Sequence, residues 1–298
     1  MINGSLVALV TPFLDADLDA GTDAGLDETA LQSMVRWHIE QGTHGIVPVG
    51  TTGESATLTE QEHCRVIELV VQAAAGRIPV VAGAGSNNTR EAIFYNEHAQ
   101  QYGADASLHV AGYYNRPSQE GLFRHFEALS KVSKIPIVVY NIPPRATVDI
   151  LPETMARIAA LPNIVGVKDA TADLTRPMLE RMLIKGEFSY LSGEDGSAVA
   201  YNAAGGNGCI SVTANIAPAL CAEMQTACLE GDFKKAMSIQ DRLLPLHLAL
   251  FAEPNPAGAK YAASLLGLCD DFCRLPMVPL ADGSKSKIRG AMSGLGLI

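Results

Sequence analysis

The chain has 298 residues, 48% of them hydrophobic and 18% charged, so it can bury a sizeable core in one large α/β barrel or in two smaller domains. Its formal net charge is −10 and its charges are scattered without a basic run, which argues against nucleic acid and anionic membranes as partners. The first residues lack the basic segment of a signal peptide and the apolar stretches are too short to span a membrane, so we expect a cytoplasmic protein.

Short runs rich in valine and isoleucine recur along the chain, and most of them end in glycine, proline, asparagine or aspartate. This composition is typical of buried strands that are followed by turns. Eight strands are therefore predicted, at residues 5–13, 45–50, 78–85, 106–114, 135–143, 163–170, 188–194 and 206–212.

Amphipathic stretches separate these runs and predict helices. Thr59 with Glu62 three residues later predicts a capping box, and Pro152 suits the first turn of a helix. Eight consecutive strand–helix units favour a closed (β/α)₈ TIM barrel over residues 1–230. The predicted helices cover residues 27–41, 59–75, 88–101, 118–131, 152–160, 173–184, 196–204 and 216–230.

The pattern changes after residue 230. Three helical stretches, at 231–251, 256–268 and 285–297, follow one another without a strand between them. We expect residues 231–298 to form a C-terminal helical extension that packs on the barrel.

Lys168 ends an apolar strand, on the rim where barrel enzymes place their active sites. Such a lysine can simply reach solvent or pair with Asp169. The alternative is an amine held in an apolar wall, where loss of water disfavours the ammonium form, so that the amine can attack a carbonyl. The resulting iminium is an electron sink, and loss of a proton from the neighbouring carbon gives an enamine nucleophile.

Other polar residues follow neighbouring strands on the same rim. Tyr140 could shuttle protons, or be a half-buried core tyrosine. The glycine-flanked Thr51 and Thr52 could bind a small carboxylate, or form an ordinary turn. Arg145, in a loop stiffened by two prolines, could hold a second carboxylate, or lie on the surface.

Patterns for metals and nucleotides are missing from the sequence. The six cysteines contain no CxxC pair and the seven histidines no HExxH motif, so we expect reduced thiols and no metal site. The run GAGSNN at 83–88 is not a dinucleotide-binding fingerprint.

Seven sequence motifs match those of one enzyme family. They are GTTGESATL, YYNRPSQEGL, YNIPPR, GVKDAT, SGEDGSA, GCISVTAN and EPNPAGAK. Through them the chain resembles, along essentially its whole length, the dihydrodipicolinate synthase and N-acetylneuraminate lyase family of pyruvate-dependent class I aldolases. The sequences of these motifs are most similar to those of the synthases.

The resemblance implies four catalytic residues. Lys168 would form a Schiff base with pyruvate, and Tyr140 would donate and accept protons. Thr51 would link Tyr140 to Tyr114, which in this family reaches in from the neighbouring subunit. A homodimer or homotetramer is therefore implied.

The resemblance also implies the substrates. Thr52, Ile210 and Gly193 would bind pyruvate, and Arg145 would hold the carboxylate of L-aspartate 4-semialdehyde. The enamine would attack the aldehyde, and cyclisation would give 4-hydroxy-tetrahydrodipicolinate for lysine and diaminopimelate biosynthesis, with no cofactor. Arg145 favours the synthases, since the sialic-acid lyases lack it. The alternative is another pyruvate or 2-keto-acid lyase, dehydratase or deaminase of the family.

Three features depart from the usual synthase sequence: Ala111-Gly112 before the tyrosines, Asp169 in place of glutamate, and Ala146 in place of threonine. Feedback inhibition by lysine is a further implication. Glu60 stands where sensitive enzymes often carry histidine. The family's regulatory positions fall on Ser55, Ala56, Glu60, His63, Asn87, Glu91 and Tyr113.

Overall fold

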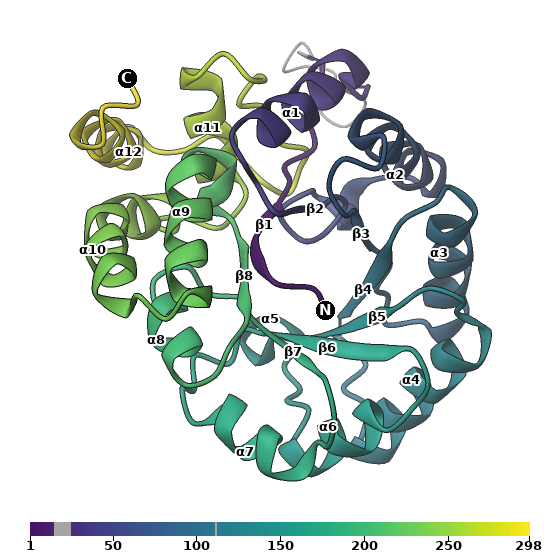
Figure 1. Ribbon diagram of the computed structural model, residues 1–298. Coiled ribbons are helices and arrows are strands. Elements are labelled where there is room, and N and C mark those ends of the chain that lie inside the picture. Colours follow the sequence, from purple (N-terminus) through teal and green to yellow (C-terminus); the bar gives the residue numbers. More distant parts are fainter. Residues whose placement is uncertain (15–24, 111) are drawn as a thin grey trace.

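The computed structural model describes residues 1–14, 25–110 and 112–298 and shows a ring of eight parallel strands (Figure 1). The sheet runs in the order β2-β1-β8-β7-β6-β5-β4-β3. A single parallel bridge between Ile46 and Val80 joins β2 to β3 and closes the ring. The strands are β1 (Gly4–Ala8), β2 (Gly45–Val47), β3 (Val81–Gly83), β4 (Ala106–Val110), β5 (Ile137–Asn141), β6 (Ile164–Asp169), β7 (Ser189–Ser192) and β8 (Gly208–Ser211).

Helices surround the ring, so the predicted TIM barrel is confirmed. Thr59 and Glu62 form the predicted capping box, with Glu62 N donating to Thr59 Oγ1 at 3.2 Å. Pro152 begins its helix, as predicted. The outer helices are α1 (Glu28–Glu40), α2 (Glu60–Ala74), α3 (Thr89–Gln101), α4 (Gln119–Val132), α6 (Pro152–Ala159), α7 (Arg176–Leu183), α8 (Ala198–Ala203) and α9 (Pro218–Leu229).

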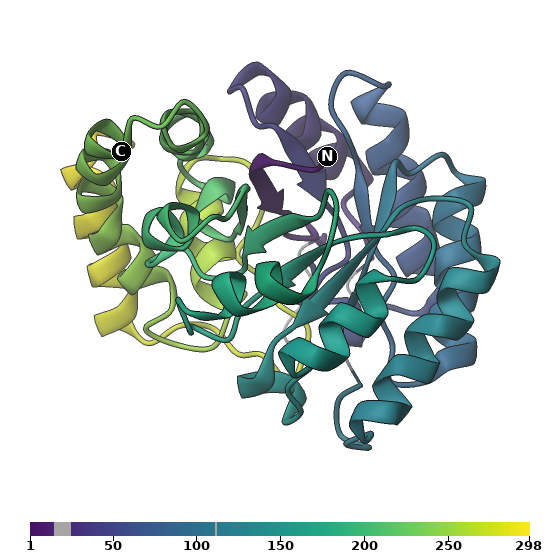
Figure 2. The ribbon, with the colours of Figure 1, turned by 60° about the horizontal axis from the view of Figure 1, so that its bottom comes forward.

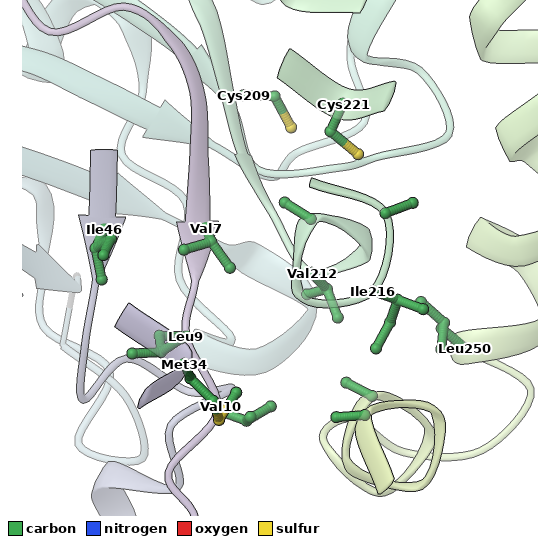
Figure 3. Packing of buried hydrophobic residues seen from close by; sticks show 14 of the residues in the cluster. Val7, Leu9, Val10, Met34, Ile46, Cys209, Val212, Ile216, Cys221 and Leu250 are labelled. Carbon is green, nitrogen blue, oxygen red and sulfur yellow. The ribbon is translucent and has the colours of Figure 1, made fainter. Parts of the chain in front are cut away.

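The last part of the chain adds three helices outside the ring (Figure 2). They are α10 (Phe233–Leu250), α11 (Ala257–Leu265) and α12 (Asp282–Gly294). Leu250 at the end of α10 belongs to the same buried cluster as Ile216 and as Val7 of β1 (Figure 3). The predicted C-terminal extension therefore shares a core with the barrel, and the predicted boundary after residue 230 lies between α9 and α10.

The strands bury both faces, as their continuous apolar runs predict. Leu6, Tyr140 and Ile210 belong to one cluster that fills the ring, whereas Val7 and Val167 pack against the outer helices. Because side chains alternate along a strand, the residue after Val167 faces the interior. This residue is Lys168.

Three predicted details differ from the structure. The proline-stiffened loop at Arg145 is the short helix α5 (Pro143–Ala146), because proline also suits the first turn of a helix. Helix α7 begins at Arg176 rather than at residue 173, where Asp173 instead accepts a hydrogen bond from Thr175 N at 2.9 Å. Helix α12 begins at Asp282, three residues before its predicted start at residue 285.

The predicted strand 106–114 includes Ala111, which lies outside the described residues, and β4 ends at Val110. Within the described ranges, none of the helices combines the length and the apolar character that crossing a membrane requires.

Candidate active site

Lys168 and Tyr140 lie side by side inside the ring. They are paired residues of β6 and β5, and the lysine Nζ is 4.2 Å from the centroid of the tyrosine ring. Only 7% of Lys168 and 6% of Tyr140 is exposed. Lys168 forms no ion pair with any residue that the structure describes, and Asp169 faces the outer helices. The amine is thus held in the barrel interior beside a phenol.

Gly193 and Ile210 complete the surroundings of the lysine. A Cβ atom at Gly193 would lie 3.1 Å from Lys168 Cε and 3.0 Å from the Cβ of Ala170. A side chain there would crowd the amine, so the glycine keeps space free beside it. Ile210 on β8 is buried in the same interior cluster as Tyr140. The structure therefore brings Lys168, Tyr140, Gly193 and Ile210 together.

The loop after β2 carries Thr51 and Thr52. A Cβ atom at Gly53 would meet Val49 N at 2.9 Å, so only glycine permits this tight turn. Thr52 is buried and its hydroxyl oxygen accepts a hydrogen bond from Asn255 Nδ2 at 3.0 Å. Thr51 is exposed and lines a cavity.

That cavity has a volume of about 460 Å³ and lies where α5 meets the loop after β2. Thr51, Ile142 and Arg145 line it together with Asn255. Tyr114 is 90% exposed, and no hydrogen bond joins it to Thr51 or Tyr140 within the part of the chain that the structure describes. The predicted proton relay is therefore not formed inside a single chain.

The same cavity holds most of the predicted regulatory residues. Asn87 is next to it and donates from Nδ2 to Tyr113 O at 3.1 Å. Glu60 lies exposed in the first turn of α2. Burial lowers the pKa of His63 to about 4, so this ring is neutral at pH 7. The regulatory residues that line the cavity are Ser55, Ala56, His63, Glu91 and Tyr113.

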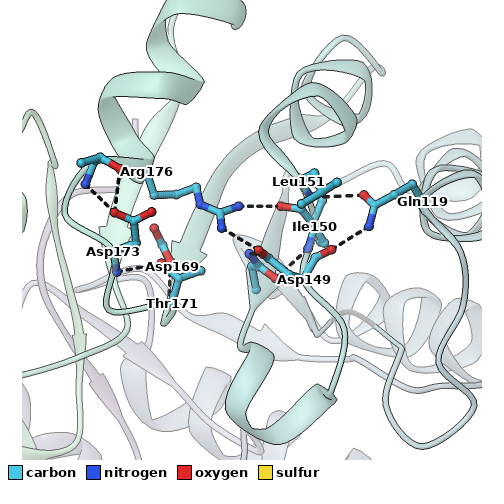
Figure 4. Close-up of polar contacts among 10 residues, drawn as sticks. Gln119, Asp149, Ile150, Leu151, Asp169, Thr171, Asp173 and Arg176 are labelled. Carbon is cyan, nitrogen blue, oxygen red and sulfur yellow. Dashed lines mark hydrogen bonds and ion pairs between the residues drawn. The ribbon is translucent and has the colours of Figure 1, made fainter.

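A polar network fixes the segment that follows α5 (Figure 4). Arg176 pairs with Asp149 at 2.6 Å and donates to Ile150 O at 2.9 Å. Gln119 donates to Asp149 O at 2.7 Å from the opposite side. Arg145 precedes this segment by a few residues, so the network restricts where its helix can lie.

Three buried polar residues near the threonine loop were not predicted. Glu54 accepts from Lys260 Nζ at 2.8 Å, and both side chains are almost fully buried. Asn255 is the third. A signal was present, because Asn255 and Lys260 belong to the motif EPNPAGAK and Lys260 is the only charged residue in an otherwise apolar helix. The partner of each residue is too distant in sequence to be inferred.

Two buried carboxyl groups, those of Asp169 on β6 and Glu180 on α7, lie outside the ring of strands. Burial raises the pKa of Asp169. Glu180 on α7 is 1% exposed, and burial together with the charge of Asp169 raises its pKa to about 8. Its Oε2 atom has no hydrogen-bond partner among the described residues. The fold therefore holds Glu180 as a protonated acid at neutral pH.

Glu180→Gln is expected to make the protein more resistant to alkaline pH. The folded state keeps a proton that the unfolded chain releases above pH 4.5, so ionisation of Glu180 costs stability as the pH rises toward 8. The free energy of unfolding of the variant relative to the wild type should rise by about 2 kcal/mol between pH 5.5 and 7.5. Urea unfolding at both pH values measures this difference. Glu187→Gln, at an exposed position, is the control, and a difference that stays flat with pH would refute the assignment.

Among the described residues, no group of three or more histidine, cysteine, aspartate or glutamate side chains is arranged to hold a metal ion. The expectation that the reaction needs neither metal nor cofactor stays a prediction. What the site offers is an amine, a phenol and threonine hydroxyls at one mouth of the barrel.

A lysine inside the mouth of a (β/α)₈ barrel, with a tyrosine on the next strand, is the arrangement of the class of barrel enzymes that work through a lysine Schiff base. Comparison with known proteins identifies the family within this class. Residues 1–294 match the Dihydrodipicolinate synthetase family. The chain belongs to this family, as the sequence motifs predict.

Individual relatives agree along the full length. The chain is 58% identical to the 4-hydroxy-tetrahydrodipicolinate synthase of Acidiphilium cryptum over 298 residues, which is 100% of both chains. It is 40% identical to the dihydrodipicolinate synthase of Aquifex aeolicus, with a TM-score of 0.95 over 99% of both chains. It is 43% identical to the chloride-inhibited dihydrodipicolinate synthase of Acinetobacter baumannii complexed with pyruvate, with a TM-score of 0.95 over 100% of both chains.

Proposed function

We propose that this chain is a lyase that condenses pyruvate with L-aspartate 4-semialdehyde to give 4-hydroxy-tetrahydrodipicolinate. The activity follows from the family, from full-length relatives of that name and from a relative complexed with pyruvate. The single observation that carries it to this chain is the buried amine of Lys168 beside Tyr140. The reaction serves lysine and diaminopimelate biosynthesis, and we place it in the cytoplasm.

The chemistry begins at the lysine. The Nζ of Lys168 adds to C2 of pyruvate, and loss of water gives an iminium. A proton leaves C3 to form the enamine, whose C3 then bonds to the aldehyde carbon of the second substrate. The amine of that substrate finally closes the ring on C2 and displaces the lysine. The net products are the cyclic acid and one water, and the iminium takes the place of a cofactor.

Each remaining site residue has a place in this scheme. Tyr140, 4.2 Å from the lysine as measured to its ring centroid, passes protons to and from the pyruvate carbons and oxygen. Thr52 donates to the pyruvate carboxylate, with Ile210 and Gly193 shaping the pocket. Thr51 links Tyr140 to a Tyr114 from another copy of this chain.

The exposure of Tyr114 supports a homodimer or homotetramer. This tyrosine is 90% exposed and its backbone has a positive φ of 67°, which a non-glycine residue adopts only when the surrounding structure holds it there. A large aromatic ring in such a position is suited to enter a neighbouring subunit. The catalytic relay would then be complete only in the assembled protein.

The cavity next to Arg145 supports two further roles. Arg145 binds the carboxylate of the semialdehyde, and the regulatory residues in and beside the same cavity bind lysine. Glu91 suits an ammonium group, and Asn87 with Tyr113 suits a carboxylate. An assay of pyruvate with aspartate 4-semialdehyde tests the reaction. Initial rates that do not change with millimolar L-lysine would remove the regulatory role alone.

Arg145→Ala is expected to raise KM for aspartate 4-semialdehyde by about 30-fold, equivalent to about 2 kcal/mol, while KM for pyruvate changes little. The reason is that only the second substrate would lose its carboxylate partner. Steady-state kinetics with each substrate varied in turn gives both constants. Arg242→Ala, on the exposed side of α10, is the matched control. Equal increases of both KM values would count against the assigned role.

A further inference from the structure

The C-terminal extension reaches across the chain to the threonine loop. Asn255 donates from Nδ2 to Thr52 Oγ1 at 3.0 Å, and these residues are 203 positions apart. Lys260 Nζ lies 2.8 Å from Glu54 Oε1, and the second oxygen of Glu54 accepts from Arg274 N at 3.0 Å. The loop that presents Thr51 and Thr52 is thus held from a part of the chain outside the barrel.

The loop needs such an anchor because its backbone is strained. Val49 and Glu54, at its two ends, adopt positive φ angles of 47° and 55° without being glycine. These conformations persist only where the surroundings determine them. The Glu54 carboxylate, with two partners from the extension, fixes one end of the loop.

The ion pair between Lys260 and Glu54 has a large desolvation cost because both charges are buried. The side chain of Lys260 is 0% exposed and that of Glu54 is 2% exposed, and the lysine Nζ also lies 4.1 Å from the centroid of the Phe13 ring. Apolar residues of similar volume often stabilise a fold as well as a buried ion pair does. What the ion pair adds is a directed contact that sets where the loop lies.

Asn255 acts directly on the hydroxyl of Thr52. The asparagine N–H occupies a lone pair of the threonine oxygen, so the hydroxyl proton remains free to donate to another acceptor. Thr52 and Asn255 are both buried, with 4% and 6% exposed, so water does not compete for these contacts. A carboxylate at the mouth of the barrel would accept a hydrogen bond from that hydroxyl.

We infer that Asn255 is a positioning residue that orients the Thr52 hydroxyl toward the carboxylate of the keto acid, while Lys260 and Glu54 hold the loop in place. The inference rests on the proposed function, in which Thr52 binds pyruvate. It assigns to the motif EPNPAGAK a part in substrate binding that is exerted through the loop. Asn255 acts on pyruvate through Thr52 rather than by direct contact.

The test is kinetic and uses the full-length protein. Asn255→Ala should raise KM for pyruvate by about 5- to 10-fold, the range that one neutral hydrogen bond controls. Both kcat and KM for the semialdehyde should change less than about twofold, because Lys168 and Arg145 are untouched. Asn255→Leu, which keeps the volume and removes the donor, should behave like Asn255→Ala. A residue that only fills space would instead be replaced by leucine without effect.

Two controls keep the result specific. Tyr261→Phe removes the hydrogen bond from Arg289 Nε to Tyr261 Oη inside the extension, and should leave both KM values unchanged. Borohydride trapping over a range of pyruvate concentrations should show the same 5- to 10-fold shift in half-saturation for Asn255→Ala. An unchanged KM for pyruvate, or equal increases for both substrates, would overturn the inference.

The trapping series also separates this inference from the proposed function. A wild type that traps pyruvate but does not condense it with aspartate 4-semialdehyde would refute the second substrate and leave Asn255 to be judged by half-saturation alone. A wild type that traps no pyruvate would refute the proposed function.

Discussion

Lys168→Ala is expected to lower kcat/KM for the condensation by about 10⁴-fold or more, which corresponds to about 5.4 kcal/mol of lost transition-state stabilisation. The reason is that, among the residues that the structure describes, no other lysine amine lies beside Tyr140. Lys168 is the buried lysine beside Tyr140. The other buried lysine among the described residues, Lys260, forms an ion pair with Glu54. Without the iminium there is no electron sink, and C3 of pyruvate cannot become a nucleophile. Steady-state rates with both substrates measure the loss.

Lys185→Ala is the matched control, since this lysine is exposed beyond α7. It should retain wild-type kinetics, and both variants should have wild-type circular dichroism. A Lys168→Ala protein that keeps activity close to that of the wild type would show that the reaction does not pass through this nitrogen.

Lys260→Met should lower the free energy of unfolding by about 3–5 kcal/mol, because it leaves the Glu54 carboxylate buried without its cation. The methionine fills much of the lysine volume beside Phe13, so the loss reports the charge rather than a cavity. Glu54→Gln introduced into Lys260→Met removes the unpaired charge and should restore at least part of the stability. Urea unfolding at a fixed protein concentration measures all three proteins.

Lys234→Met, at an exposed position of α10, should stay within about 0.5 kcal/mol of the wild type. If Lys260→Met unfolded at the same urea concentration as Lys234→Met, the ion pair would not be the anchor of the loop. A double variant no more stable than Lys260→Met would show that the loss of unfolding free energy does not come from the unpaired Glu54 carboxylate.

The barrel could be predicted because its information is local. Valine- and isoleucine-rich runs ending in turn residues mark the strands, and the alternation of side chains places Lys168 inside once Val167 packs outward. The capping box at Thr59 and the proline at the start of α6 are equally local signals. The short helix α5 cannot be recognised from local sequence, since two prolines are typical both of a stiff loop and of a first helical turn.

The support of the site could not be predicted from local patterns. Glu54 is part of an ordinary-looking loop, and nothing near it in sequence indicates that a lysine 206 residues away would be its partner. That contact depends on how the extension packs on the barrel. Likewise, the raised pKa of Glu180 arises from burial against Asp169 on the back of β6, and a helix with several charged residues does not reveal which of them is buried.

The Schiff base at Lys168 is tested most directly by incubating the wild-type protein with pyruvate, reducing it with borohydride, and determining the mass of every lysine-containing peptide. We expect one reduced pyruvyl group, located on the peptide that carries Lys168 and missing from Lys168→Ala. A label on another lysine, or no label on the wild type, would contradict it.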